Sequence, residues 1–400
     1  MKNRPHQKFA DVDLAEALTR AEALIPLLKE QAPAGEAATR VTPRVMAALH
    51  ESGLMRYHQP RRWGGMELDF VAMMDIPELL ARGDASAAWT VVNLAGHHRM
   101  LSLYPPRAQE ELWGEDPDVG IASGIAFIQG QARRVDGGLV LTGKWGFSSG
   151  VDHSSWNMLA CVVKADDKPV DWCMCLIPAT DYEVIDDWQT LGMRATGSRS
   201  VRCAEVFVPD YRVVSYHLAR PGHEFPGWKV NPNPMYRIPL SAFAGYGLAG
   251  CLIGNAQAAL DTSVELVKAR STSYTGARMR DFQTVQWRIA EAGAKIDCVR
   301  NWLRQDCIGA QSWVQSGRSL DTEMKLRYRR NAALGVRLLT EAVDSLHELA
   351  GAHGIYDNFP LQRIFRDAHA GAAHINFSVD TQFPPWGLVS LGGEFKSPTL

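Results

Sequence analysis

The sequence predicts an α+β protein in which a β domain separates two helical domains. Three observations indicate this. Apolar residues recur at helical spacing in residues 1–114, β-branched runs broken by glycine fill residues 115–225, and long helical patterns return in residues 226–400. This order differs from the alternation of strands and helices in a doubly wound sheet. We therefore expect an N-terminal helical domain, a central β-barrel or β-sandwich domain and a C-terminal helical bundle with these boundaries.

The N-terminal domain opens with an amphipathic pattern over residues 11–31, where leucine, isoleucine and alanine recur every three or four positions. A second helix is expected to follow Thr42, because threonine is a good N-cap and Pro43 suits the first helical position. Gly53 marks the expected end of this helix. After a turn-rich link, residues 83–104 resume the helical pattern.

The central domain contains two local patterns. Asp136-Gly137-Gly138 is typical of a tight β-hairpin turn. Residues 146–150 read Gly-Phe-Ser-Ser-Gly, which fits the G-x-S-x-G pattern of a hydrolase nucleophile elbow. That elbow requires a strand, a sharp turn and then a helix, whereas the residues that follow here indicate a loop and a strand. A serine hydrolase is therefore disfavoured.

The C-terminal domain is predicted to consist of long helices. Residues 239–270 combine helical spacing with many glycine and alanine residues, which suits close packing between helices. Residues 281–310 and 325–351 contain two more long helical patterns.

The composition disfavours several classes of partner. Lys and Arg number 42 against 44 Asp and Glu, a formal net charge of -2, so we expect no binding to nucleic acid or to an anionic membrane. No apolar run approaches the ~18 residues of a membrane span, and the polar N-terminus lacks a signal-peptide core, which favours a cytoplasmic protein. The scattered cysteines predict no metal site, and the lack of a G-x-G-x-x-G pattern predicts no nicotinamide site.

Four stretches, in chain order, resemble segments of the acyl-CoA dehydrogenase fold family. They are residues 59–70 (QPRRWGGMELDF), 139–156 (LVLTGKWGFSSGVDHSSW), 186–214, which contains GMRATGS and ends in VFVPDYRVV, and 349–374 (LAGAHGIYDNFPLQRIFRDAHAGAAH). Together they span nearly the whole chain. The resemblance implies an acyl-CoA dehydrogenase-like fold that binds a flavin.

Within this fold the resemblance separates two chemistries. Acyl-CoA dehydrogenases commonly carry a glutamate base nine residues beyond the arginine of an Arg-Asp pair, but nine residues beyond Arg366 this chain has Ile375. The two-component flavin monooxygenases of the fold carry instead a Phe-Ser-Ser-Gly turn, a histidine after a tryptophan-containing helix, and a histidine eight residues past that arginine. This sequence resembles them at residues 147–150, at His97 and at His374.

The resemblance implies that reduced FMN or FAD is supplied by a separate NAD(P)H-dependent flavin reductase. With O2 as co-substrate it forms a C4a-hydroperoxyflavin, which hydroxylates a small aromatic substrate, phenolic or indolic. The protein must then keep flavin N5 protonated, exclude water and position the substrate. The alternative is an acyl-CoA dehydrogenase-like flavin oxidoreductase. The exact substrate, the oxygenated atom and the choice between FMN and FAD stay open.

The Gly-Phe-Ser-Ser-Gly turn is expected to contact the flavin ring. Phe147 matches the tryptophan of the family's flavin-binding strand, so Ser149 falls on the threonine that bonds flavin N5. Ser148 is the alternative for this contact, and Gly150 completes the turn. A serine hydroxyl can accept a hydrogen bond from N5–H, which stabilises the protonated flavin.

Two histidines are the expected acid–base residues. His97 resembles the histidine that deprotonates a phenol, with its neighbour His98 as a rival for that role. His374 would lie beside the reactive oxygen and take part in proton transfer. It falls at helical spacing with four preceding residues, so one helix face is expected to carry Arg363, Arg366, Asp367, Ala370 and His374.

The flavin phosphate needs cations. Arg278, Arg280 and Phe282 resemble the family's phosphate-binding segment, although Gln283 stands where the family has glycine. Arg366 is also expected at the cofactor. The resemblance further implies a homotetramer whose subunits share the flavin site.

Overall fold

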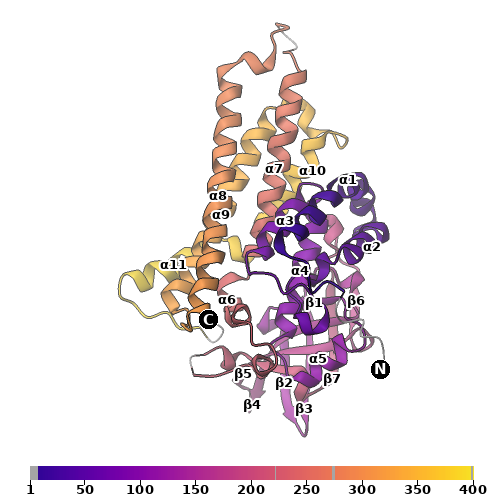
Figure 1. Ribbon diagram of the computed structural model, residues 1–400, viewed down its shortest axis with the longest axis vertical. Helices are drawn as coiled ribbons and strands as arrows, with labels where there is room; N and C mark the ends of the chain where they lie inside the picture. The colour runs from indigo at the N-terminus through magenta and orange to yellow at the C-terminus, as the bar shows by residue number, and fades with distance from the viewer. Residues whose placement is uncertain (1–7, 221, 273–274, 398–399) are drawn as a thin grey trace.

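The structure is a computed structural model that describes residues 8–220, 222–272, 275–397 and 400. The predicted order of a helical, a β and a second helical region is confirmed (Figure 1). In that view the strands gather at the lower end of the molecule, and the long C-terminal helices form its elongated upper part. The polar stretch 1–7 lies outside the described residues.

The N-terminal helices place α4 inside the protein. The helices are α1 (Leu14–Ala38), α2 (Pro43–Ser52), α3 (Ala72–Ala81), α4 (Ala85–Leu101) and α5 (Pro106–Trp113). The predicted caps of α2 are confirmed, because Thr42 Oγ1 accepts a hydrogen bond from the Val45 N–H at 3.4 Å and Gly53 ends the helix at a φ of 77°. Most side chains of α4 are buried, so several elements fix its orientation.

The described residues of the central region form one mixed sheet of eight strands. The strands are β1 (Ile121–Gly124), β2 (Gly130–Val135), β3 (Gly138–Trp145), β4 (Trp156–Ala165), β5 (Lys168–Pro178), β6 (Glu183–Ile185), β7 (Ser200–Pro209) and β8 (Val213–Ser215). Their order is β6-β7-β3-β2-β4-β5-β8, and β1 pairs in parallel with β4. The predicted hairpin is confirmed, since Val135 pairs with Gly138 across the turn.

Both faces of the sheet are buried along β4. Along β4, Leu159 and Cys161 enter one apolar core, whereas Met158 and Ala160 enter a second core that also contains side chains of α5. β1, which pairs with β4, lies against α4.

Trp145 fixes the end of β3. Its ring is fully buried, and its Nε1 donates a hydrogen bond to the Ala160 carbonyl at 2.8 Å. Glycines make room for the ring: a Cβ added at Gly130 would lie 2.4 Å from it, and one at Gly143 would lie 2.7 Å away. The chain therefore enters the Gly146–Gly150 turn from a firmly held strand.

The C-terminal region contains the long helices that the sequence predicts. They are α6 (Leu240–Phe243), α7 (Tyr246–Ala269), α8 (Gln283–Gln315), α9 (Thr322–Glu348), α10 (Pro360–Ala372) and α11 (Val379–Ser390). The predicted use of small residues for close packing is confirmed at Gly254 of α7, where an added Cβ would lie 2.0 Å from the Glu78 carbonyl oxygen of α3.

The prediction that His374 lies on the same helix face as Arg363, Arg366, Asp367 and Ala370 is wrong. α10 stops at Ala372, and His374 is the N-cap of a short 3-10 turn with extended backbone angles of φ -63° and ψ 139°. The chain leaves the helix here so that Phe377 can enter the core, where it is buried. Within α10, Asp367 accepts a hydrogen bond from the Met193 N–H at 2.6 Å.

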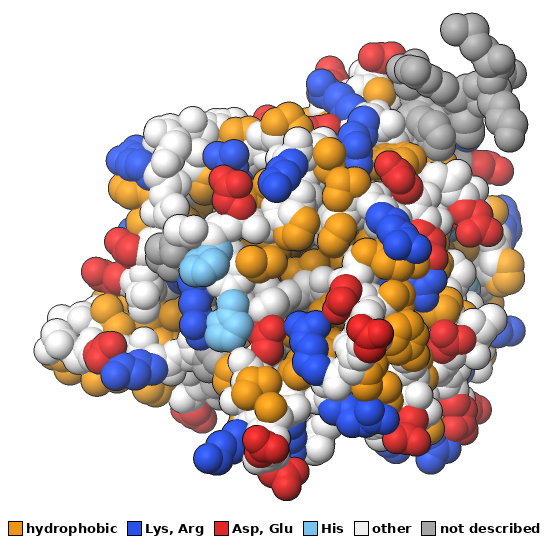
Figure 2. Space-filling model, turned by 90° about the horizontal axis from the view of Figure 1, so that it is seen from below, with side chains coloured by type: hydrophobic (Ala, Val, Ile, Leu, Met, Phe, Trp, Pro, Cys, Tyr) orange, Lys and Arg blue, Asp and Glu red, His pale blue; other side chains and the backbone are white. Residues whose placement is uncertain are grey.

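The surface shows mixed charge. On the face drawn in Figure 2, basic and acidic side chains are interspersed, and neither sign forms a continuous field. No helix in the described part of the chain is long and apolar enough to cross a membrane.

Candidate active site

A cavity of about 280 Å³ lies between α4, β1, α6 and the corner that follows α10. Both predicted catalytic histidines, His97 and His374, line it. Its other polar lining residues are Tyr57, His58, Asn93, Arg99, Ser123, Tyr216, Ser241, Arg329 and Asn376. The rest of the wall is mostly apolar, which is typical of a pocket for a small organic ligand. Among the described residues that line the cavity, none is an aspartate or glutamate.

His97 is held between α4 and β1 by a hydrogen bond that it donates to β1. Its Nδ1 lies 2.6 Å from the Ile121 carbonyl oxygen, and because a carbonyl can only accept, Nδ1 carries the proton. Burial lowers the pKa of His97 to about 4, and the bond to Ile121 only partly opposes this. The imidazole is therefore neutral at pH 7, with the lone pair of Nε2 free to accept a proton.

His374 has the opposite arrangement. Its Nδ1 accepts a hydrogen bond from the Asn376 N–H at 3.2 Å, so in the neutral ring the proton is on Nε2. Burial lowers the pKa of His374 to about 4, which keeps the ring neutral at pH 7. The ring packs edge-on against Trp89 of α4 at 6.0 Å between centroids. His374 is thus a fixed hydrogen-bond donor.

His98 lies away from the cavity. Its Nδ1 accepts a hydrogen bond from the Trp113 indole at 2.8 Å, and the two rings stack at 6.0 Å. Burial lowers the pKa of His98 to about 3. It belongs to the packing between α4 and α5, and of the two neighbouring histidines only His97 lines the cavity.

The Gly146–Gly150 turn packs against α4, the helix that carries His97. A Cβ added at Gly150 would lie 3.1 Å from both Leu94 and Thr90, and Gly150 has a φ of 74°. Phe147 also has a positive φ, 63°, with its ring 75% exposed and set edge-on against Trp188. A non-glycine residue in this region is strained, and such strain is typical of functional turns.

The two serines of the turn have different surroundings. Ser148 is fully buried, and its Oγ accepts a hydrogen bond from Asn157 Nδ2 at 2.9 Å. Ser149 keeps 7% exposure, and its Oγ lies 2.7 Å from Ser198 Oγ.

The direction of the hydrogen bonds at Ser149 follows from its neighbours. Thr196 Oγ1 donates to the Met193 carbonyl at 2.8 Å, so Ser198 must donate to Thr196 at 2.7 Å. Ser149 must in turn donate to Ser198. Its proton is therefore engaged, and the lone pairs of Ser149 Oγ are free to accept a hydrogen bond.

Arg278, Arg280 and Phe282 lie far from this cavity within one chain. They follow α7, whose first turns reach the cavity at Leu248, and the helix then runs to Ala269, about 30 Å at 1.5 Å per residue. Arg278 and Arg280 are exposed, and both pair with Asp281. The structure does not bring these residues together with His97, Ser149 and His374.

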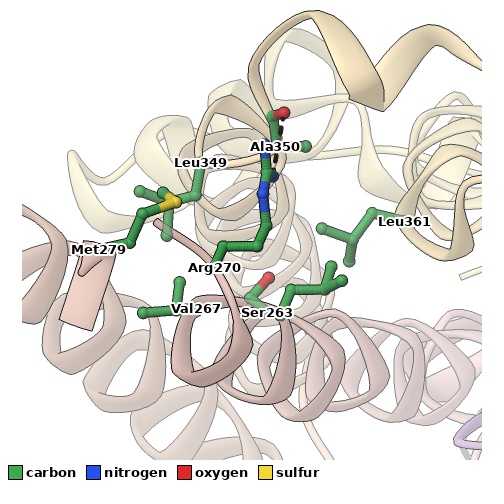
Figure 3. Close-up of a pocket in the computed structure, with 8 residues that line it drawn as sticks. Ser263, Val267, Arg270, Met279, Leu349, Ala350 and Leu361 are labelled. Atoms are coloured by element: carbon green, nitrogen blue, oxygen red, sulfur yellow. Dashed lines mark hydrogen bonds between the residues drawn. The ribbon is translucent and has the colours of Figure 1, made fainter. Parts of the chain in front are cut away.

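A small pocket lies at the same far end of α7 (Figure 3). Arg270 extends from the helix end beside Ser263 and Val267, and its Nη1 donates to the Ala350 carbonyl at 3.3 Å. The pocket has a volume of about 10 Å³, which is enough for a water molecule and not for a cofactor.

Arg366 is occupied by contacts within the chain. Its Nη1 lies 2.5 Å from the Glu36 carboxylate and donates to the Leu191 carbonyl at 2.8 Å, while its Nε donates to Gln362 at 2.9 Å. These bonds tie α10 to α1 and to the loop before β7, which carries Thr196 and Ser198.

Sequence reasoning missed several residues of the site. Thr196 and Ser198, which orient Ser149, lie in the stretch 186–214 that resembles the family, so that resemblance was an available signal. Arg99 lies two residues beyond His97, and no local pattern distinguishes it from an ordinary arginine near a helix end.

Comparison with known families supports the same fold. Residues 15–114 match the family described as the acyl-CoA dehydrogenase N-terminal domain, and residues 246–379 match the acyl-CoA dehydrogenase C-terminal domain.

Individual relatives are more specific. The chain is 34% identical to the oxygenase subunit HsaA of a flavin-dependent monooxygenase from Rhodococcus jostii (strain RHA1), over 95% of this chain and 98% of that one. It is 31% identical to the oxygenase component of an FADH2-dependent resorcinol hydroxylase from Rhizobium sp. (strain MTP-10005), over 94% of each. Among solved structures, XiaF from Streptomyces sp. in complex with FADH2 and glycerol superposes with a TM-score of 0.89, at 28% identity over 96% of this chain and 97% of that one.

The helical, β, helical order and the two family matches place the chain in the acyl-CoA dehydrogenase fold family. Within that class, the chain belongs to the flavin-dependent monooxygenases, as an oxygenase component that uses reduced flavin. The predicted fold class and enzyme class are confirmed.

Proposed function

We propose that this enzyme hydroxylates a phenolic small molecule bound in the α4 cavity. One observation carries the proposal: the cavity holds two neutral histidines of opposite tautomer. His97 has its proton on Nδ1 and can accept at Nε2, whereas His374 has its proton on Nε2 and can donate there. That pair suits a reaction in which a phenol loses a proton while the oxygen it attacks receives a hydrogen bond. The absence of a carboxylate among the described lining residues disfavours the dehydrogenase alternative.

The residues of the Gly146–Gly150 turn fit a flavin. Ser149 Oγ offers free lone pairs, and the exposed ring of Phe147 offers an apolar face for the edge of a flat cofactor. A bound reduced flavin supplies the electrons with which dioxygen is activated for transfer of one oxygen atom. We assign Ser149 to accept the hydrogen bond from N5–H. The full burial of Ser148 and its bond from Asn157 favour Ser149 over Ser148 for this role.

The protonation of N5 is the task of Ser149. An acceptor at this atom favours the protonated ring, and loss of that proton would release the oxygen as hydrogen peroxide. The hydroxyl relay through Ser198 and Thr196 keeps Ser149 in the accepting orientation.

His97 acts on the substrate. Its Nε2 accepts the phenol proton as the ring carbon attacks oxygen, and the Ile121 carbonyl stabilises the imidazolium that results. Because the pKa of His97 is lowered to about 4, we expect the proton to move during oxygen transfer and not before it. His374 donates from Nε2 toward the reacting oxygen.

The flavin site is expected to include residues of a neighbouring subunit. We infer a homotetramer in which Arg278, Arg280 and Phe282 of a neighbouring subunit serve the flavin phosphate, since both arginines are exposed and lie far from the cavity of their own chain. Reduced flavin is supplied by a separate NAD(P)H-dependent reductase, as the naming of the relatives as subunits and components implies.

The decisive experiment supplies chemically reduced FMN or FAD and ¹⁸O2 to the purified protein in the presence of resorcinol and of 3-(4-hydroxyphenyl)propanoate. We expect one ¹⁸O atom in a ring-hydroxylated product by mass spectrometry. Stoichiometric hydrogen peroxide with no labelled product from either phenol would overturn the proposal. A desaturated, unlabelled product would indicate a dehydrogenase.

A further inference from the structure

The cavity that contains His97 also contains a buried positive charge. Arg99 lines the cavity and is 5% exposed. Its Nη2 donates to the Ile238 carbonyl, its Cζ lies 4.9 Å from the centre of the Phe70 ring, and its buried Nε has no hydrogen-bond partner. In the described part of the chain, no aspartate or glutamate lines the cavity, and the side chains that act most strongly on Arg99 are tyrosines and a cysteine.

The groups around Arg99 do not compensate its charge. They are Tyr57, Tyr216, Tyr236 and Cys307. Burial raises the pKa of each, to about 12 for Tyr216, so all four are neutral at pH 7. Burial lowers the pKa of Arg99 only to about 10, so the guanidinium remains charged. A buried charge without a counter-charge is costly, which indicates that a ligand supplies the missing anion.

The geometry of α4 relates Arg99 to His97. At about 100° per residue, the two side chains leave the helix about 160° apart, at opposite margins of the face that lines the cavity. Gly96 lies between them on that face. A Cβ added at Gly96 would meet no heavy atom closer than the Tyr57 hydroxyl, at 4.0 Å, so a flat ring has room there.

We propose that Arg99 determines specificity by binding a carboxylate of the substrate. The aromatic ring then lies over Gly96, with its phenol hydroxyl at His97 and its carboxylate at the guanidinium. Arginine binds carboxylates with paired, charge-assisted hydrogen bonds, and the free Nε is one such donor. The substrate class is a hydroxyaryl carboxylic acid. This inference rests on the proposed hydroxylase function, because it places the phenol at His97.

Arg329 provides a matched control. It lines the same cavity from α9, and burial lowers its pKa, but its Nε donates to Gln382 Oε1 at 2.8 Å. Arg329 therefore tests whether any arginine that lines the cavity would bind the carboxylate.

The test is a binding measurement and requires no turnover. Calorimetry compares 3-(4-hydroxyphenyl)propanoate with its neutral amide on wild-type protein, Arg99→Met, Arg99→Lys and Arg329→Met. We expect wild type to prefer the acid, and Arg99→Met to weaken acid binding roughly 10- to 100-fold while amide binding changes less than about threefold. Arg99→Lys should recover part of the preference, and Arg329→Met should keep it.

A second experiment distinguishes the substrate carboxylate from the flavin phosphate as the anion that Arg99 binds. FMN and riboflavin are titrated into wild type and Arg99→Met, and we expect equal affinities in both proteins, which also shows that the variant is folded. Three results would overturn the inference: no preference of wild type for the acid, a preference that survives in Arg99→Met or is lost in Arg329→Met, or a selective loss of FMN over riboflavin. Because binding is the readout, failure of hydroxylation alone leaves this test intact.

Discussion

The α4 wall of the cavity and the corner after α10 each present a buried histidine with a pKa lowered to about 4, yet the two rings have opposite hydrogen bonding. On α4, the Ile121 carbonyl fixes the proton of His97 on Nδ1 and leaves Nε2 as an acceptor. At the corner, the Asn376 N–H fixes the proton of His374 on Nε2 and makes it a donor. The backbone group at Nδ1 therefore decides whether Nε2 of a neutral imidazole accepts or donates a hydrogen bond.

Removing the acceptor should have the largest effect. His97→Ala should lower the rate of hydroxylation about 10²- to 10⁴-fold, the usual contribution of a general base, while reduced flavin is still oxidised by O2. Product and hydrogen peroxide are measured per flavin oxidised. His98→Ala is the control and should keep normal coupling of flavin oxidation to product. If His97→Ala still couples flavin oxidation to product normally, His97 is not the proton acceptor.

Removing the donor should cost less. His374→Ala loses one hydrogen bond to the reacting oxygen, for which we expect a drop of roughly 10- to 100-fold in the hydroxylation rate. Stopped-flow absorbance of flavin oxidation and product analysis measure it. His374→Ala behaving like His97→Ala in both rate and coupling would show that the two histidines act as one unit.

Ser149 is expected to act before either histidine, because its bond to flavin N5 limits the release of hydrogen peroxide. Ser149→Ala should raise hydrogen peroxide release several-fold at unchanged substrate affinity, since the acceptor for N5–H is lost. Ser148→Ala should change coupling less, because its hydroxyl is turned toward Asn157. Equal leakage from both variants would contradict the assignment.

The change in folding stability with pH should be the smallest of these effects. Burial lowers the pKa of both cavity histidines from the ordinary 6.5 to about 4, so between these values the unfolded state binds protons that the folded state does not. Stability should therefore fall as pH is lowered from about 6.5 toward 4, and His374→Gln should flatten that fall by a few degrees in Tm. A Tm that rises on acidification would contradict the buried, neutral state.

The fold could be predicted from the sequence because its signals are local. Helical spacing, the caps at Thr42 and Gly53, and the turn before Gly138 are all fixed by neighbouring residues. The end of α10 could not be predicted, because the helical spacing continues to His374 while tertiary packing of Phe377 redirects the chain.

The sequence could propose residues for the candidate site but not their hydrogen bonding. The family resemblance indicates His97, Ser149 and His374, but the orientation of each depends on partners distant in sequence, such as Ile121 for His97 and Ser198 for Ser149. Arg99 became a candidate only when the structure showed that no aspartate or glutamate among the described residues lines its cavity. The role of Arg366 at the cofactor stays a prediction.

A glutamine substitution at each histidine tests the opposite roles most directly, because an amide can donate a hydrogen bond but cannot take up the phenol proton. The measurement is the yield of hydroxylated product per reduced flavin in a single turnover of wild type, His97→Gln and His374→Gln. We expect His374→Gln to retain most of the yield and His97→Gln to lose nearly all of it to hydrogen peroxide. Equal loss in the two variants, or the reverse order, would contradict an acceptor at His97 and a donor at His374.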